Sequence, residues 1–244
     1  GQTPLLAASL EGHSTIVEML VNANADVNIA NNDDRTPIFM ATMRGHSTIV
    51  EMLANANANV NMASTYGATP LYTASRRGDS IIVEMLVNAN ADVNIFTRAN
   101  MTPLFISSQE GHATIVQMLV NSNADLNIAD KYGDTPLNVA SSRGHSTIVE
   151  ILVNANADVN IANDDGETPL YIASQKGHPT IVEMLVNANA DVNIPEEYGL
   201  TPLFAASSRG HTNIVEMLVN ANADVNNADR YGPSPLYIAC SGGH

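Results

Sequence analysis

Histidine is the residue type in this chain with the most versatile side-chain chemistry, and it recurs about once per 33 residues. Imidazole can ligate zinc or act as a general base. Histidines that belong to neighbouring packed units would lie about 10 Å apart, which is too far for several of them to share one ion. Asp79 also breaks the series. We therefore expect no metal site from His13, His46, His112, His145, His178 and His211.

The remaining residues do not form a catalytic pattern. No nucleophile, base and orienting residue recur together outside the repeated framework. The single cysteine, Cys240, lies close to the C-terminal end. No Gly-rich phosphate-binding loop is present either. The sequence thus predicts a protein that is not an enzyme and that needs no cofactor.

The histidines belong to a strict repeat of 33 residues, which the dipeptide Thr-Pro marks. A fixed period of this length indicates one supersecondary unit stacked along the chain, in which each unit contacts only its neighbours. We expect one array over residues 1–244, with seven full units and a partial unit from Ser234. The full units start at Thr3, Thr36, Thr69, Thr102, Thr135, Thr168 and Thr201.

The repeat that begins at Thr168 predicts two short helices separated by a tight turn. The Thr168 hydroxyl can cap a helix, and Pro169 suits the first helical position, where no N–H donor is needed. Gly177-His178 is the expected turn. The second helix is predicted by an apolar stripe made of Ile181, Val182, Leu185 and Val186.

Asparagine follows the second helix in all seven full repeats, at a position where we expect a left-handed backbone. Asp191–Ile194 is then expected to be extended, and Tyr198-Gly199 to form a hairpin tip. The same left-handed backbone is expected at the hairpin residues Asp34 and Asn100, which stand where other repeats have glycine. The helix-ending asparagines are Asn24, Asn57, Asn90, Asn123, Asn156, Asn189 and Asn222.

Helix, tight turn, helix and hairpin in this order resemble the ankyrin repeat. The resemblance covers the whole chain and rests on Thr-Pro-Leu, an Ala/Ser pair, Gly-His, Ile-Val-Glu and Ala-Asp-Val-Asn. It implies an all-α repeat solenoid, a curved stack of helix-turn-helix units with β-hairpin loops. The histidine that is usual after Thr-Pro-Leu is replaced, and we expect the aromatic replacements to pack between repeats. All the replacements are Leu6, Phe39, Tyr72, Phe105, Asn138, Tyr171, Phe204 and Tyr237.

Basic and aromatic residues are confined to the hairpins and the first helices, which line the concave side in the ankyrin family. Tyrosine and arginine are enriched at binding hot spots. A cation is also favoured at a helix C-terminus by the dipole alone, and a hairpin tyrosine can simply cover its neighbour's backbone. The candidate partner-binding residues are Arg44, Arg77, Arg143, Lys176, Arg209, Tyr66, Tyr132, Tyr198 and Tyr231.

The resemblance also suggests a modification. Ankyrin repeats with leucine eight residues before the asparagine of an Asp-Val-Asn loop resemble substrates of asparaginyl hydroxylases. The alternative is that this asparagine only holds its loop through local hydrogen bonds, which we favour. The candidate positions are Asn28, Asn94, Asn160, Asn193 and Asn226.

These features together favour a non-catalytic module that binds a protein segment on its concave face. The formal charge of -15 opposes non-specific binding to nucleic acid, and the apolar runs are too short to cross a membrane. A single cysteine fits a reducing, cytoplasmic compartment. We expect a monomer whose uncapped ends, at Leu5-Leu6 and Leu236–Ile238, are partly exposed and allow end-to-end association.

Two other functions fit the same sequence. Near-identical repeats suit a structural spacer or scaffold without a specific ligand, although the variable hairpins argue against it. The chain also begins and ends inside a repeat, which suits the regulatory or targeting arm of a larger protein, enzymatic or not, that is truncated here. A consensus-derived array is a third interpretation, and the irregular hairpins disfavour it.

Overall fold

A computed structural model describes residues 1–226, which fold into fourteen α-helices without a β-strand. The chain divides into two compact units, Gly1–Asp125 and the residues from Leu126 onward. The partial repeat from Ser234, with Leu236–Ile238, and the residues Tyr231 and Cys240 lie outside the described residues. The expectation of an all-helical repeat protein is confirmed.

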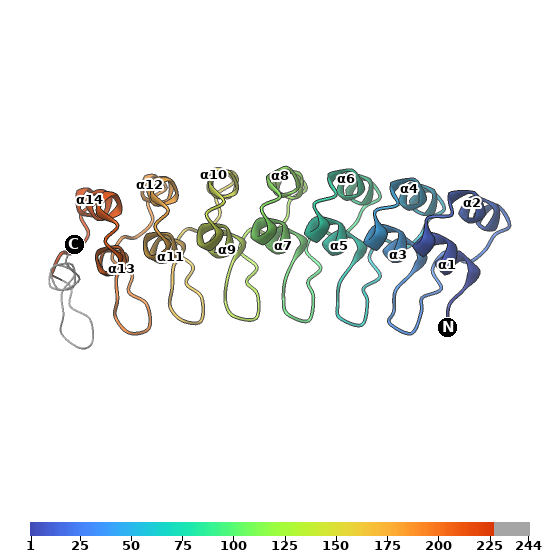
Figure 1. Ribbon diagram of the computed structural model, residues 1–244, viewed down its shortest axis with the longest axis horizontal. Helices are drawn as coiled ribbons and strands as arrows, with labels where there is room; N and C mark the ends of the chain where they lie inside the picture. Colours follow the sequence, from blue (N-terminus) through green and yellow to red (C-terminus); the bar gives the residue numbers. More distant parts are fainter. Residues whose placement is uncertain (227–244) are drawn as a thin grey trace. The chain divides into compact units, whose positions relative to one another are not determined.

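The first unit contains four pairs of helices. In each pair the first helix packs on its partner and on the first helices of neighbouring pairs, and the second helices form a parallel row (Figure 1). The pairs are α1 (Pro4–Glu11) with α2 (Ser14–Asn22), α3 (Pro37–Arg44) with α4 (Ser47–Asn55), α5 (Pro70–Arg77) with α6 (Ser80–Asn88), and α7 (Pro103–Glu110) with α8 (Ala113–Asn121).

The described part of the second unit contains three pairs built in the same way. The first helices again pack on one another in sequence, as do the second helices. The pairs are α9 (Pro136–Arg143) with α10 (Ser146–Asn154), α11 (Pro169–Lys176) with α12 (Pro179–Asn187), and α13 (Pro202–Arg209) with α14 (Thr212–Asn220).

Each first helix begins at a threonine cap, as the sequence predicts. The Thr69 hydroxyl oxygen accepts a hydrogen bond from the backbone N–H of Tyr72 at 3.1 Å, and Thr69 itself is buried. A cap of this kind contributes about 1 kcal/mol. Thr168 caps α11 in the same way, accepting from the backbone N–H of Tyr171 at 3.2 Å.

Asparagine after each second helix adopts the left-handed backbone that the sequence predicts. The φ angles of the seven asparagines lie between 58° and 65°, and Asp34 and Asn100 in the hairpins have φ of 59° and 57°. The expectation that Asp191–Ile194 is extended is wrong. Val192 and Asn193 form a turn, because the Asp191 carboxylate accepts a hydrogen bond from the backbone N–H of Asn193 at 2.9 Å.

The hairpin loops return the chain to the next repeat without forming strands in residues 1–226. Their ends are joined by backbone hydrogen bonds, such as the one that Ser64 N–H donates to the carbonyl of Ala68 at 2.8 Å. In both units the loops extend beyond the first helices, on the side away from the second helices (Figure 1). First helices and hairpins therefore share one face of each unit.

The core lies between neighbouring pairs, where an isoleucine, a valine and a leucine of each second helix from α4 to α12 are buried. The expected exposure of Leu5-Leu6 is wrong, since these side chains are only 2% and 0% exposed. Leu6 clusters with Phe39 and Met40 of α3, so α1 turns its leucines toward the next repeat. At this end the exposed apolar residues are instead on α2, as described below.

Candidate functional site

The candidate site is the face formed by the first helices and the hairpins, called here the hairpin face of each unit. Helix ends and loop tips meet on it, so it carries side chains that the core does not constrain. The first helices and hairpins together carry every basic and aromatic residue of the chain that the structure describes, although the aromatic residues near the starts of the first helices are buried. The second helices carry glutamate at six of seven equivalent positions and no basic residue.

The basic candidates lie where the sequence predicts them, at the last residue of a first helix. Arg44 and Arg77 end α3 and α5 in the first unit, and Arg143, Lys176 and Arg209 end α9, α11 and α13 in the second. All five side chains are exposed. Their positive charge interacts favourably with the negative, C-terminal end of each helix dipole, and their exposure leaves them accessible to a partner.

The tyrosine candidates lie at hairpin tips. The exposed fractions of Tyr66, Tyr132 and Tyr198 are 66%, 59% and 51%. The ammonium of Lys131 lies 4.6 Å from the ring centroid of Tyr132, a cation–π contact on the surface. The three tyrosine rings are therefore accessible to a partner and are not buried against a neighbouring backbone. Tyr231 lies outside the described residues.

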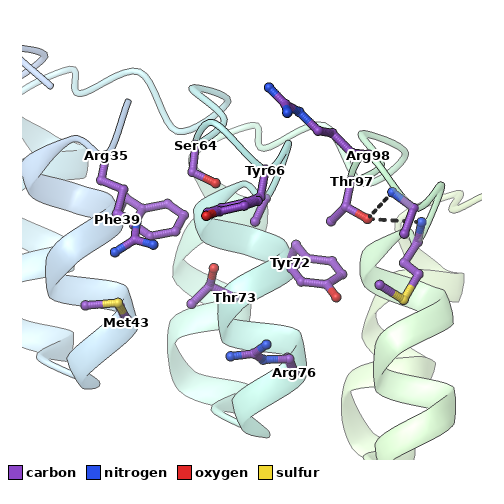
Figure 2. A pocket seen from close by; sticks show the side chains of 13 residues that line it. Arg35, Phe39, Met43, Ser64, Tyr66, Tyr72, Thr73, Arg76, Thr97 and Arg98 are labelled. Carbon is purple, nitrogen blue, oxygen red and sulfur yellow. Dashed lines mark hydrogen bonds between the residues drawn. The ribbon is translucent and has the colours of Figure 1, made fainter. Parts of the chain in front are cut away.

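Hydrogen bonds hold the hairpin tips in place. The Thr97 hydroxyl oxygen accepts bonds from the backbone N–H groups of Ala99 and Met101, both at 3.3 Å (Figure 2). Consecutive tips are also joined, because the backbone N–H of Arg98 donates to the carbonyl of Tyr66 at 3.0 Å. These loops therefore present their side chains from fixed positions.

The repeated histidines contact the repeat that precedes their own. Nε2 of His46, His112 and His211 lies 3.2–3.3 Å from a backbone carbonyl oxygen near the end of the preceding first helix. The ring packs on the glycine that ends that helix: a Cβ at Gly78 would lie 2.6 Å from His112 Cε1. Gly-His is thus a contact between repeats as well as a turn, a role that the sequence analysis missed.

The asparagines proposed for hydroxylation lie in the loops after the second helices. The side-chain oxygens of Asn28, Asn94, Asn160 and Asn193 each accept a hydrogen bond from a backbone N–H of the next repeat, at 2.7–2.9 Å. Asn226 donates its backbone N–H to the Asp224 carboxylate at 2.9 Å. These hydrogen bonds support the role that we favour, in which the asparagine holds its loop in place. Hydroxylation stays a prediction, which measurement of the intact mass tests.

The residues that replace the usual histidine after Thr-Pro-Leu are buried between repeats in the described part of the chain, as expected for the aromatic ones. Asn138 retains a polar function there. Its amide donates to the backbone carbonyl of Glu167 at 3.1 Å, and its side-chain oxygen accepts from the Thr135 hydroxyl. The amide therefore ties α9 to the following hairpin. In the other described repeats, Leu6 and the aromatic residues fill this space by packing.

A pocket of about 360 Å³ opens on the hairpin face of the first unit, and sequence analysis did not predict it. Figure 2 shows Phe39, Tyr66 and Tyr72 around it, with Arg76 at the lower edge of the view. Of the predicted partner-binding residues, only Tyr66 lines it. The other lining side chains include Arg35, Arg98, Met43 and Met101. The sequence feature that could have indicated this pocket is the adjacent pair Arg76-Arg77. Of the two residues, only Arg76 lines the pocket.

The hairpins of the second unit carry an acidic group instead. Burial raises the pKa of Asp134, and the hydrogen bond from the Asn163 amide at 3.0 Å only partly offsets this. Burial likewise raises the pKa of Glu167, and the charges of Asp165, Asp134 and Glu196 raise it further. The two units thus present different charge on their hairpin faces.

Comparison with protein families identifies the repeat. The family model for ankyrin repeats (three copies) matches residues 1–64, 57–130, 104–196 and 188–244, so its matches cover the whole chain. The chain belongs to the ankyrin repeat family. Ankyrin repeats are generally protein–protein interaction modules and are typically not catalytic. A comparison with curated proteins found no match.

No helix in the described part of this ankyrin repeat protein combines the length and the apolar character needed to cross a membrane. Residues 1–226 also hold no group of three or more histidine, cysteine, aspartate or glutamate side chains placed to bind a metal ion.

Proposed function

We propose that the hairpin faces of this ankyrin repeat protein bind a segment of a partner protein without catalysing a reaction on it. The observation that carries the proposal is the exposure of Tyr66, Tyr132 and Tyr198 on tips that hydrogen bonds hold in place. A rigid, exposed aromatic side chain gives a large contact area at a small cost in conformational entropy.

Charge supports a partner that is at least partly acidic. Arg44, Arg77, Arg143, Lys176 and Arg209 are exposed on the same faces as the tyrosines. Acidic hairpin residues between them oppose indiscriminate attraction, so charge sets the register of the partner more than the overall affinity. The net charge of -15 disfavours nucleic acid as the partner. A cytoplasmic location, which a single cysteine suits, is part of the proposal.

The test is affinity capture from a lysate of the source organism with three forms of the protein. The wild type is compared with the charge variant Arg77→Glu/Arg143→Glu/Arg209→Glu. The control is Thr48→Glu/Thr147→Glu/Thr180→Glu, which adds three carboxylates at exposed positions near the starts of second helices. Carboxylates there suit the helix dipole, so the control should keep its fold.

A protein that the wild type and the control retain, and that the charge variant loses, supports the proposal. Equal retention by all three forms would show that the basic side chains of the hairpin face do not bind the partner. Retention of nothing by any form would favour the spacer instead.

A further inference from the structure

The pocket of the first unit combines positive charge with apolar surface. It spans three consecutive hairpins, from Arg35 to Met101, and the two first helices α3 and α5. Three arginines contribute to its lining, Arg35, Arg76 and Arg98, and no aspartate or glutamate does. This concentration of positive charge occurs in a chain whose formal net charge is -15.

The guanidinium groups lack strong partners within the described residues. No carboxylate in residues 1–226 forms an ion pair with Arg76 or Arg98. Arg35 approaches the carboxylate of Asp33 only at 3.9 Å, and its buried Nε has no hydrogen-bond acceptor. Buried N–H groups in proteins are normally satisfied. Arg35 Nε is therefore a buried donor for which the described chain supplies no acceptor, and Arg76 and Arg98 are exposed cations without an ion-pair partner in residues 1–226.

The apolar part of the pocket suits one anchoring side chain. Phe39, Met43, Tyr72 and Met101 supply aromatic rings and thioethers, which adapt to differently shaped apolar groups. The Arg35 guanidinium lies 5.7 Å from the centroid of the Phe39 ring, so charge and apolar surface meet at this point. A volume of about 360 Å³ is near the lower limit of small-ligand sites and accommodates one large side chain with its neighbours.

We infer that this pocket binds an extended peptide segment in which an apolar side chain is flanked by carboxylates. The apolar side chain enters between Phe39 and Tyr72, and the carboxylates accept hydrogen bonds from Arg76 and Arg98. Three repeats extend over roughly 20 Å, two helix-packing steps. At about 3.3 Å per residue, six extended residues cover that length. This inference rests on the proposed function, because it specifies the chemistry of the partner segment at one pocket of the hairpin face.

The surroundings of the pocket set limits on the ligand. Asp33 lies next to Arg35, and the charge of Glu110 on α7 reaches Tyr72. Carboxylates at these edges confine an acidic ligand to the centre of the pocket. On the hairpins of the second unit, Asp164, Asp165, Glu167 and Glu197 repel the same peptide, so the second unit is an internal comparison.

The experiment uses the full chain and a positional-scanning library of immobilised hexapeptides. We expect the wild type to select aspartate or glutamate on both sides of leucine, methionine or phenylalanine. The selected peptide is then titrated by fluorescence anisotropy. Arg76→Glu/Arg98→Glu should bind it at least about tenfold more weakly, the size of effect typical of a binding hot spot.

Two matched variants separate charge at the pocket from charge in general. Thr48→Glu/Thr147→Glu/Thr180→Glu, the control of the capture experiment, adds three negative charges on second helices, away from the hairpin face, and should keep the wild-type affinity. Arg76→Lys/Arg98→Lys keeps the charge without the planar fork and should fall between the wild type and the glutamate variant. Circular dichroism checks that each variant keeps its helices.

Selection of neutral or basic peptides, selection of none, or equal binding by Arg76→Glu/Arg98→Glu would overturn the inference. None of these results affects the proposed function, which capture with the Arg77/Arg143/Arg209 variant tests separately. Conversely, an acidic peptide that binds at the pocket while no protein is captured from the lysate would support the inference and leave a role for the basic side chains of the second unit without support.

Discussion

The side-chain oxygen of Asn160 accepts a hydrogen bond from the backbone N–H of Asp191, 2.8 Å away in the next repeat. Asn28, Asn94 and Asn193 accept equivalent bonds, each from a residue 31 positions later. A single asparagine per repeat thus fixes the distance between successive loops. Because each repeat contacts only its neighbours, such bonds contribute to every interface in turn.

Removing this bond should weaken the second unit. We expect Asn160→Ala to lower the free energy of unfolding by about 1 kcal/mol, the usual net contribution of one hydrogen bond. The matched control is Asn187→Ala, at the exposed end of α12, which should change stability by less than about 0.5 kcal/mol. Urea denaturation of both variants makes the comparison. Equal stability of the two would show that water replaces the bond at no cost.

The left-handed backbone at Asn90 predicts a stabilising substitution. With φ of 60°, Asn90 adopts a conformation that glycine reaches without the Cβ penalty. We expect Asn90→Gly to raise the melting temperature through a gain of about 0.5 kcal/mol, because glycine also gains freedom in the unfolded chain. In Asn88→Gly the same change falls on the last residue of α6, whose backbone is helical, and should lower the melting temperature. An unchanged or lower value for Asn90→Gly would contradict the prediction.

Local chemistry explains why the fold could be predicted from the sequence. The Thr69 cap, Pro70 at the first helical position and the left-handed Asn90 each depend on a few neighbouring residues. The period of 33 residues then repeats the same local solution along the chain. The turn at Asp191–Asn193 was missed because the aspartate side chain competes with an extended backbone, which composition alone does not reveal.

The candidate site was only partly predictable, because it depends on contacts between repeats. The exposed ends of the first helices, such as Arg77, and the hairpin tip at Tyr66 follow from position within one repeat. The pocket that Arg76 lines does not, because its walls come from three hairpins and two first helices. Nor does the bond between His211 and the carbonyl of Gln175, which spans 36 residues.

Burial raises the pKa of Asp134, and this predicts how stability depends on pH. A carboxyl whose pKa is higher in the folded than in the unfolded protein binds more protons when folded. Its contribution to stability is therefore unfavourable at neutral pH and disappears as pH falls below the unfolded pKa, near 4. Glu167 contributes with the same sign.

Replacement of this carboxylate should therefore stabilise the protein at neutral pH. Asp134→Asn keeps an oxygen that can accept from the Asn163 amide and removes the charge. We expect a gain of less than about 1 kcal/mol at pH 7, since the site is partly exposed to solvent, and almost no gain at about pH 3, below the unfolded pKa. Urea denaturation at both pH values measures the difference. A gain that does not change with pH would assign the effect to packing rather than to charge.

The apolar residues exposed at the N-terminal end predict self-association. Ile16 and Met19 of α2 are 47% and 66% exposed, whereas Ile49, the equivalent of Ile16 in the next repeat, is 1% exposed. The difference arises because α1 and α2 are the first pair within residues 1–226, so no other described pair covers this side of α2. An end repeat without a polar outer face tends to associate through it.

Light scattering over a range of concentrations tests this association. We expect the average mass of the wild type to rise with concentration, and that of Met19→Lys to stay closer to the monomer because a charge would have to be buried in the contact. Ile81→Lys is the matched control: Ile81 is also an exposed apolar residue, but it lies on α6 within the array. This control should associate as the wild type does. A wild-type mass independent of concentration would rule out association through either end, whereas equal loss in both variants would show that added positive charge, not the α2 surface, keeps the molecules apart.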